Sequence, residues 1–62
     1  MTGIERIRKK QNMTQIELAK HMGVTQANVS QWESNVAKPR AENLIKMSVL
    51  FGCTIDELLK DA

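Results

Sequence analysis

The fold of this 62-residue chain is decided by residues 14–33, TQIELAKHMGVTQANVSQWE. Apolar residues recur at the spacing of an α-helix on both sides of Gly23. Glycine readily adopts a positive φ, so Gly23 suits a tight turn between two helices. Ala19 is small enough for the second helix to cross close to the first. The stretch therefore predicts two short helices, near 14–22 and 25–34, joined by a turn.

Three further helices are expected, near 3–12, 39–51 and 54–60. In a capping box, a threonine hydroxyl and the glutamate three residues later bond each other's free amides. Three such pairs start predicted helices: Thr2 with Glu5, Thr14 with Glu17, and Thr54 with Glu57. Pro39 suits the first turn of another helix, where a missing amide costs nothing. The expected helix ends are at residues that tolerate positive φ: Asn12, Gly23, Asn35 and Gly52.

Sustained period-2 alternation is absent, so the predicted class is all-α with five short helices. Apolar residues at helical spacing define a core-facing stripe on each predicted helix. Trp32 is expected in this core because it follows Val29 by three residues. Leu58 and Leu59 supply the apolar face of the last helix.

Length and composition limit the classes of function. A chain of 62 residues is expected to form one domain, 1–62, with no separate ligand-sensing domain. One cysteine, Cys53, and one histidine, His21, cannot form a four-ligand zinc site. No catalytic set or glycine-rich phosphate loop is present, so we expect no metal, no cofactor and no enzymatic activity. No apolar run approaches the roughly 20 residues of a membrane span, which indicates a cytoplasmic protein.

The outward face of the helix near 25–34 carries no charge. It displays small or amide-bearing side chains: Gln26, Ala27, Asn28, Ser30 and Gln31. Amide side chains bond the N6 and N7 atoms of adenine in the major groove, and a methyl group contacts the methyl of thymine. Residues 14–33 are therefore interpreted as a helix-turn-helix that recognises bases in double-stranded DNA.

With this motif in place, the chain resembles the phage-repressor-like helix-turn-helix family, the Cro and lambda-repressor type also called XRE. The segments that carry the resemblance span nearly the whole chain: 7–8, 13–19, 23–26, 29–33, Pro39, 44–47, 51–52 and 54–59. The resemblance implies a lambda-repressor-like DNA-binding domain of a transcriptional regulator, of the repressor type. It also implies a homodimer on a palindromic operator, with half-sites about 34 Å apart.

The same resemblance implies a role for individual residues. Those that match the base-reading stretch of the family are Thr25, Gln26, Ala27, Asn28 and Gln31. Gln15 would bond a backbone phosphate at the start of its helix while packing on Gln26, and the amide of Thr14 would assist. Lys38 and Arg40 match basic loop positions whose phosphate contacts orient the protein without specifying sequence.

Arg8 and Glu33 match positions that form an internal ion pair in many relatives, which would tie the first helix to the end of the third. Ile45 and Val49 form an apolar i, i+4 pair that is either partly buried core or a contact with a partner. This pair motivates an alternative function. The chain would then be an antitoxin or a mobile-element controller whose main role is to bind a protein partner through the same fold.

Overall fold

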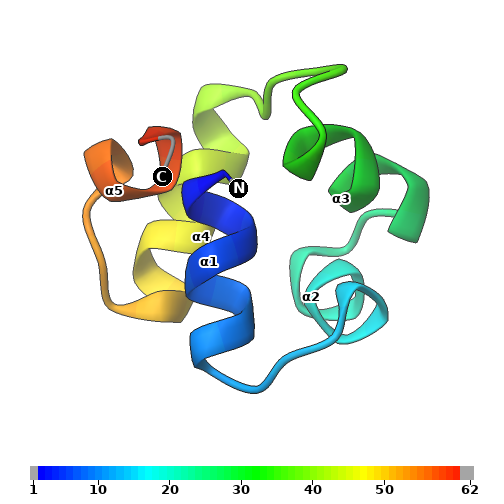
Figure 1. The fold of residues 1–62 in the computed structure, drawn as a ribbon, viewed down its shortest axis with the longest axis horizontal. Helices are drawn as coiled ribbons and strands as arrows, with labels where there is room; N and C mark the ends of the chain where they lie inside the picture. The colour runs from blue at the N-terminus through cyan, green and yellow to red at the C-terminus, as the bar shows by residue number, and fades with distance from the viewer. Residues whose placement is uncertain (1, 61–62) are drawn as a thin grey trace.

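The computed structural model describes residues 2–60 and contains five helices in that range (Figure 1). They are α1 (Gly3–Lys10), α2 (Gln15–Met22), α3 (Gln26–Glu33), α4 (Ala41–Phe51) and α5 (Ile55–Leu59). Residues 2–60 contain no strand, so the predicted all-α class is confirmed. The helices are slightly shorter than expected, mainly because the predicted ranges included capping residues, which flank the helical conformation.

Four of the five helices begin at a threonine cap. The hydroxyls of Thr2, Thr14, Thr25 and Thr54 each accept a hydrogen bond from the amide three residues later. The Thr14 box is reciprocal, because the Thr14 amide also donates to Oε1 of Glu17 over 2.9 Å. In the other two expected boxes, at Thr2 and Thr54, the described residues show only the hydrogen bond to the threonine hydroxyl and not the return bond to the glutamate. Local sequence therefore sets most helix starts.

The start of α4 differs from the expectation. Arg40 is its N-cap, with an extended backbone and no side-chain capping bond. The amides of Asn43 and Leu44 both donate to the carbonyl of Arg40 over 3.0 Å, so this carbonyl is the first of the helix. The placement of Pro39 in the first turn is wrong, since Pro39 lies in the loop before the cap. The fixed φ of proline suits both extended backbone and the first turn of a helix. Proline at position 39 therefore does not by itself place that residue inside α4.

Residues with positive φ stand at all four predicted helix ends. The φ angles are 56° at Asn12, 71° at Gly23, 62° at Asn35 and 67° at Gly52. Asparagine tolerates this left-handed region better than other side chains, which explains its use in place of glycine at two of the ends.

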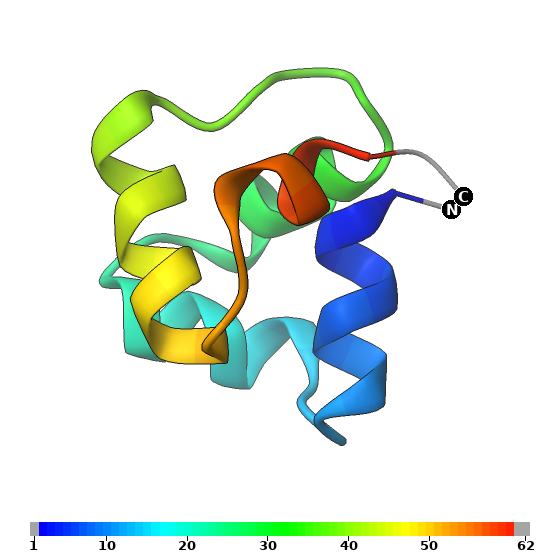
Figure 2. The same ribbon diagram turned by 90° about the vertical axis from the view of Figure 1, so that its left-hand side faces the viewer.

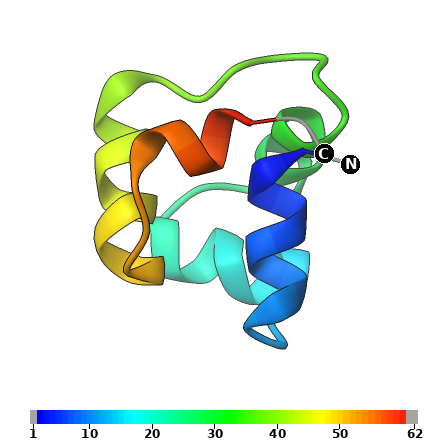
Figure 3. The same ribbon diagram turned by 60° about the vertical axis from the view of Figure 1, so that its left-hand side comes forward.

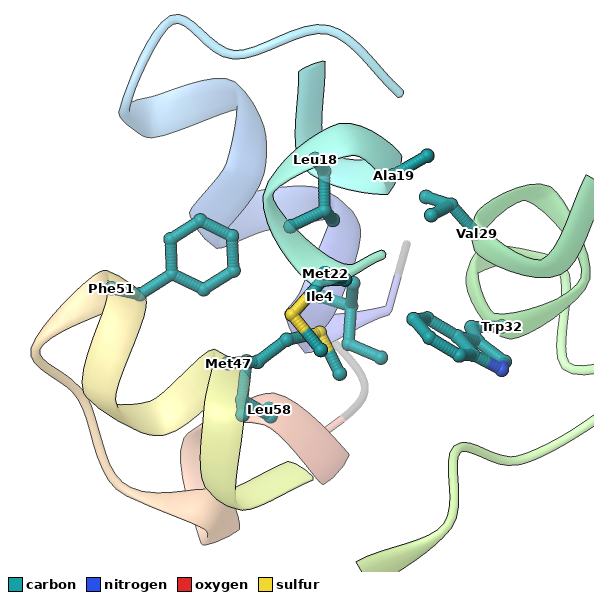
Figure 4. Close-up of a cluster of buried hydrophobic side chains, with 9 residues drawn as sticks. All are labelled: Ile4, Leu18, Ala19, Met22, Val29, Trp32, Met47, Phe51 and Leu58. Atoms are coloured by element: carbon teal, nitrogen blue, oxygen red, sulfur yellow. The ribbon is translucent and has the colours of Figure 1, made fainter. Parts of the chain in front are cut away.

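The core lies where the five helices meet (Figure 4). Every helix contributes to its buried apolar side chains: Ile4, Leu18, Ala19, Met22, Val29, Trp32, Met47, Phe51 and Leu58. The expectation that Trp32 is buried is confirmed. The expectation for Leu59 is wrong, because this side chain is 51% exposed. Helix α5 has only five residues and turns a single face to the core, and Leu58 occupies that face.

In Figure 1, α2 and α3 lie to the right of α1, α5 lies to its left, and α4 passes behind α1. The loop of residues 34–40 links α3 to α4 and runs across the top of the molecule in Figure 2 and in Figure 3. This loop carries Lys38 and Arg40 away from the end of α3 towards the start of α4. The basic loop residues and the helix-turn-helix are thus parts of one continuous segment of chain.

Candidate nucleic-acid interface

The turn between α2 and α3 has the geometry that the sequence predicts. Gly23 ends α2 in the left-handed conformation, and the amide of Val24 donates to the carbonyl of Ala19 over 3.0 Å. Figure 4 shows Ala19 on α2 next to Val29 on α3, and both side chains are buried. A larger residue than alanine would push the helices apart, because protein interiors are close-packed. The small side chain therefore fixes how α3 is held against α2.

The side chains predicted to contact bases are exposed on α3 and at its cap. They are Thr25, Gln26, Ala27, Asn28 and Gln31, and Ser30 is exposed beside them. The hydroxyl oxygen of Thr25 accepts from the amide of Asn28 over 3.2 Å, which leaves its own proton free to donate. Glu33, the one charged residue of α3, is buried. The exposed surface of α3 is therefore polar, rich in amides and uncharged.

The structure places Arg8 and Glu33 in direct contact, as the resemblance implies. Arg8 Nε lies 2.6 Å from Glu33 Oε2, and Arg8 Nη2 lies 3.0 Å from Glu33 Oε1. The third guanidinium nitrogen, Nη1, donates to the carbonyl of Met13 over 2.8 Å. The two side chains are only 9% and 4% exposed. The hydrogen bond to Glu33 raises the pKa of Arg8 above its already high value, and the contact ties α1 to the end of α3.

Gln15 makes a contact that the sequence does not predict. Its Nε2 donates to Oε1 of Glu33 over 3.0 Å, and its Oε1 accepts from Nε2 of Gln26 at 3.5 Å. The expectation that Gln15 packs on Gln26 agrees with the second contact. The first joins residues 18 positions apart, at the start of α2 and the end of α3. No local pattern signals it, because it depends on how the two helices cross.

The amide of Thr14 already has a hydrogen-bond partner in this structure. This amide donates to the carboxylate of Glu17 within the capping box. The same hydrogen bond is the main reason that the pKa of Glu17 lies below its ordinary value, so an ionised carboxylate covers this part of the helix start. Assistance from the Thr14 amide stays a prediction, and it would require this amide to leave or share its bond to Glu17. The first-turn amides of Gln15 and Ile16 have no intrahelical acceptor and are further donors at this helix start.

Lys38 and Arg40 are exposed, and neither forms an ion pair with a described residue. They line a polar hollow beside α3 together with Asn28, Trp32, Glu42 and Asn43. Two unpaired positive charges thus lie next to the uncharged amide surface. This arrangement suits a polyanion that runs past the end of α3, since phosphates attract the charges while the amides face the bases.

Residues 2–60 contain no group of three or more histidine, cysteine, aspartate or glutamate side chains that could hold a metal ion. Burial raises the pKa of the Cys53 thiol, which keeps it protonated and weakly nucleophilic. None of the described helices is long and apolar enough to cross a membrane.

Comparison with known proteins agrees with this geometry. Residues 4–58 match the model of a family described as helix-turn-helix. The chain is 42% identical over 53 residues to the repressor protein C2 of Salmonella phage P22, and 39% identical over 56 residues to the HTH-type transcriptional activator BcrR of Enterococcus faecalis. These alignments cover 86% and 90% of this chain but only 24% and 28% of the two proteins. The chain thus spans about a quarter of the length of these relatives.

Two solved structures have the same fold. The P22 c2 repressor in complex with a synthetic operator superposes with a TM-score of 0.81 at 40% identity, covering 97% of this chain and 96% of that one. A transcriptional regulator from Listeria innocua superposes with a TM-score of 0.86 at 27% identity, covering 97% of this chain and 56% of that one. Since the family match spans residues 4–58 and the fold is that of the phage repressor, this chain belongs to the helix-turn-helix family of the phage-repressor type.

Proposed function

We propose that this chain is a sequence-specific DNA-binding domain of a transcriptional regulator, with α3 in the major groove of double-stranded DNA. The observation that carries the proposal is the exposed amide surface of α3 beside the unpaired charges of Lys38 and Arg40. Amides distinguish base pairs by their donors and acceptors, whereas the basic side chains bind phosphates of any sequence. The two sets of side chains together provide specificity and affinity.

The relatives support this proposal and indicate its direction. The P22 repressor has been solved with an operator, and this chain shares 40% of its residues and almost its whole length with that structure. The curated relatives are named a repressor and an activator. We take repression as the direction of regulation, because the phage repressor is similar to this chain in both sequence and fold.

A homodimer on a palindromic operator completes the proposal. A single α3 contacts only a few base pairs, and two copies related by a two-fold axis read two half-sites about 34 Å apart. Dimerisation doubles the number of bases and phosphates contacted. Specificity and affinity both rise accordingly.

The alternative function rests on Ile45 and Val49, which are 55% and 79% exposed on α4. Their exposure leaves an apolar pair on the surface, as a protein partner would require. The two relatives and the two solved structures are named as repressors, an activator or a transcriptional regulator, which favours DNA as the principal partner.

A gel-shift titration against the DNA that flanks the gene for this chain tests the proposal. Random-sequence DNA serves as competitor at moderate salt, and the matched control is the variant Gln26→Ala/Gln31→Ala, which keeps both basic loop residues. We expect the natural chain to prefer the flanking DNA by at least about 100-fold, and the control to lose most of that preference. Equal affinity of the natural chain for both DNAs would contradict the proposed function.

A further inference from the structure

Four polar side chains from three helices form one continuous hydrogen-bonded series. Arg8 on α1 donates to Glu33 at the end of α3, and Gln15 at the start of α2 donates to the same Oε1 of Glu33. Gln26 at the start of α3 then donates to Oε1 of Gln15. The series begins at a buried ion pair and ends at a side chain on the proposed base-reading surface.

The direction of every hydrogen bond in this series follows from its buried end. An ionised carboxylate only accepts hydrogen bonds, so Gln15 must turn its NH₂ group towards Glu33. The carbonyl oxygen of Gln15 then faces Gln26, and Gln26 in turn must present its NH₂ group to that oxygen. Arg8 holds the carboxylate in place through two hydrogen bonds. The amide orientation of an exposed residue is thereby set by a buried ion pair.

This orientation has a consequence for the base that Gln26 can recognise. With one N–H bonded to Gln15, its amide keeps one N–H donor and its carbonyl oxygen. Adenine requires this pair, because it presents an acceptor at N7 and a donor at N6, whereas guanine presents two acceptors. If the side-chain amide of Gln15 were turned round, its NH₂ group would donate to the carbonyl oxygen of Gln26. Gln26 would then offer two N–H donors to the base, which suits guanine. The direction of the series therefore selects between the two purines.

We propose that Arg8 and Glu33 are positioning residues for base recognition, and that they make Gln26 select adenine over guanine by fixing the orientation of Gln15. The inference rests on the proposed DNA-binding function and adds a determinant of its specificity. In this role the ion pair contributes to recognition without touching DNA.

The variant Arg8→Met/Glu33→Met tests the inference. Replacing a buried ion pair with apolar side chains of similar volume commonly preserves or raises stability, so this variant should fold, as thermal unfolding will check. The base position read by Gln26 is identified first, as the position where Gln26→Ala abolishes preference. The measured quantity is the ratio of affinities for operators with adenine or guanine at that position.

We expect the ratio to fall from about 10-fold in the natural chain to below about 3-fold in the double variant. The preference at the position read by Gln31, whose side chain lies outside the series, is the internal control and should not change. A purely structural ion pair would leave both preferences intact or reduce them together, and either result would overturn the inference.

A second variant, Gln15→Met, keeps the ion pair and interrupts the series at its middle. It weakens binding to all sequences by removing a proposed phosphate contact, yet it should reduce the adenine-to-guanine ratio as far as the double variant does. An unchanged ratio would overturn the inference even if the double variant failed to fold. Suppose the natural chain shows a base preference at the position read by Gln31 but none between adenine and guanine at the position read by Gln26. That result would overturn the inference alone. If the natural chain shows no base preference at any position, the proposed function is overturned as well.

Discussion

Gly3 in the first turn of α1 packs directly against the backbone of Glu57 in α5. A Cβ atom at Gly3 would overlap the carbonyl oxygen of Glu57 and would lie 2.8 Å from that of Leu58. Gly3 has a helical conformation, so its need is for space and not for an unusual φ. The absence of a side chain at this position lets the N-terminal helix and the last helix close around the core.

Gly3→Ala should therefore destabilise the protein, although alanine is the better helix former by about 1 kcal/mol. Overlap with backbone atoms cannot be relieved by a rotamer change, and overpacking of this kind costs about 1–3 kcal/mol. Urea unfolding measures the loss. The control is Gly23→Ala, where the space is open but φ is +71°, which should cost about 1 kcal/mol through backbone strain alone. A Gly3→Ala protein as stable as the natural chain would show that α5 does not pack as described.

The ion pair between Arg8 and Glu33 should show strong coupling in stability. Removing one partner leaves a buried charge without its counterion, so Arg8→Met or Glu33→Met alone should cost about 3–5 kcal/mol. Both changes together should cost less than about 1 kcal/mol, because no charge remains buried. A double-mutant cycle in urea gives the coupling energy. Additive losses would mean that the two side chains do not depend on one another.

Glu17 should make stability depend on pH at the acidic end. Its pKa in the folded protein is lowered, chiefly by the hydrogen bond from the Thr14 amide, so the folded state favours the ionised form more than the unfolded state does. The stabilisation is present above the ordinary glutamate pKa and is lost as pH falls through the folded-state value.

The variant Glu17→Gln isolates this effect, because it keeps a capping side chain but removes the charge. The difference in unfolding free energy between the natural chain and Glu17→Gln should shrink as pH falls from about 7 to about 3. Urea titrations at a series of pH values measure it. A difference that stays constant over this range would rule out the ionised cap as its source.

Features that depend on neighbouring residues could be predicted from the sequence. A threonine three residues before an amide can cap it, and a residue that tolerates positive φ can end a helix, wherever the rest of the chain lies. The close approach of Gly3 to α5 and the bond from Gln15 to Glu33 depend on how distant helices pack. The prediction that Leu59 faces the core was wrong for the same reason. Apolar spacing predicts a helix face but not how much of that face the neighbouring helices cover.

The proposed division between base and phosphate contacts predicts opposite behaviour for two exposed residues. Gln31→Ala should relax the preference at one position in each half-site, at a cost of about 1–3 kcal/mol for the preferred base. Lys38→Ala should weaken binding to all sequences by a similar factor, because a phosphate contact carries no information about bases. Quantitative gel shifts on a panel of single-base operator variants distinguish the two results.

Salt dependence gives a second measure of the same division. Contacts with about four to six phosphates per dimer give a slope of log K against log salt near −4 to −5. Lys38→Ala removes one contact from each of two chains and should make the slope about 2 less negative, whereas Gln31→Ala should leave it unchanged. Lys60→Ala is the matched control, since Lys60 is also an exposed lysine but follows the acidic helix α5 and does not line the hollow of Lys38 and Arg40. If Lys38→Ala and Lys60→Ala altered the slope equally, the loop would have no special contact with phosphates and the basic charges would act only through the net charge of the chain.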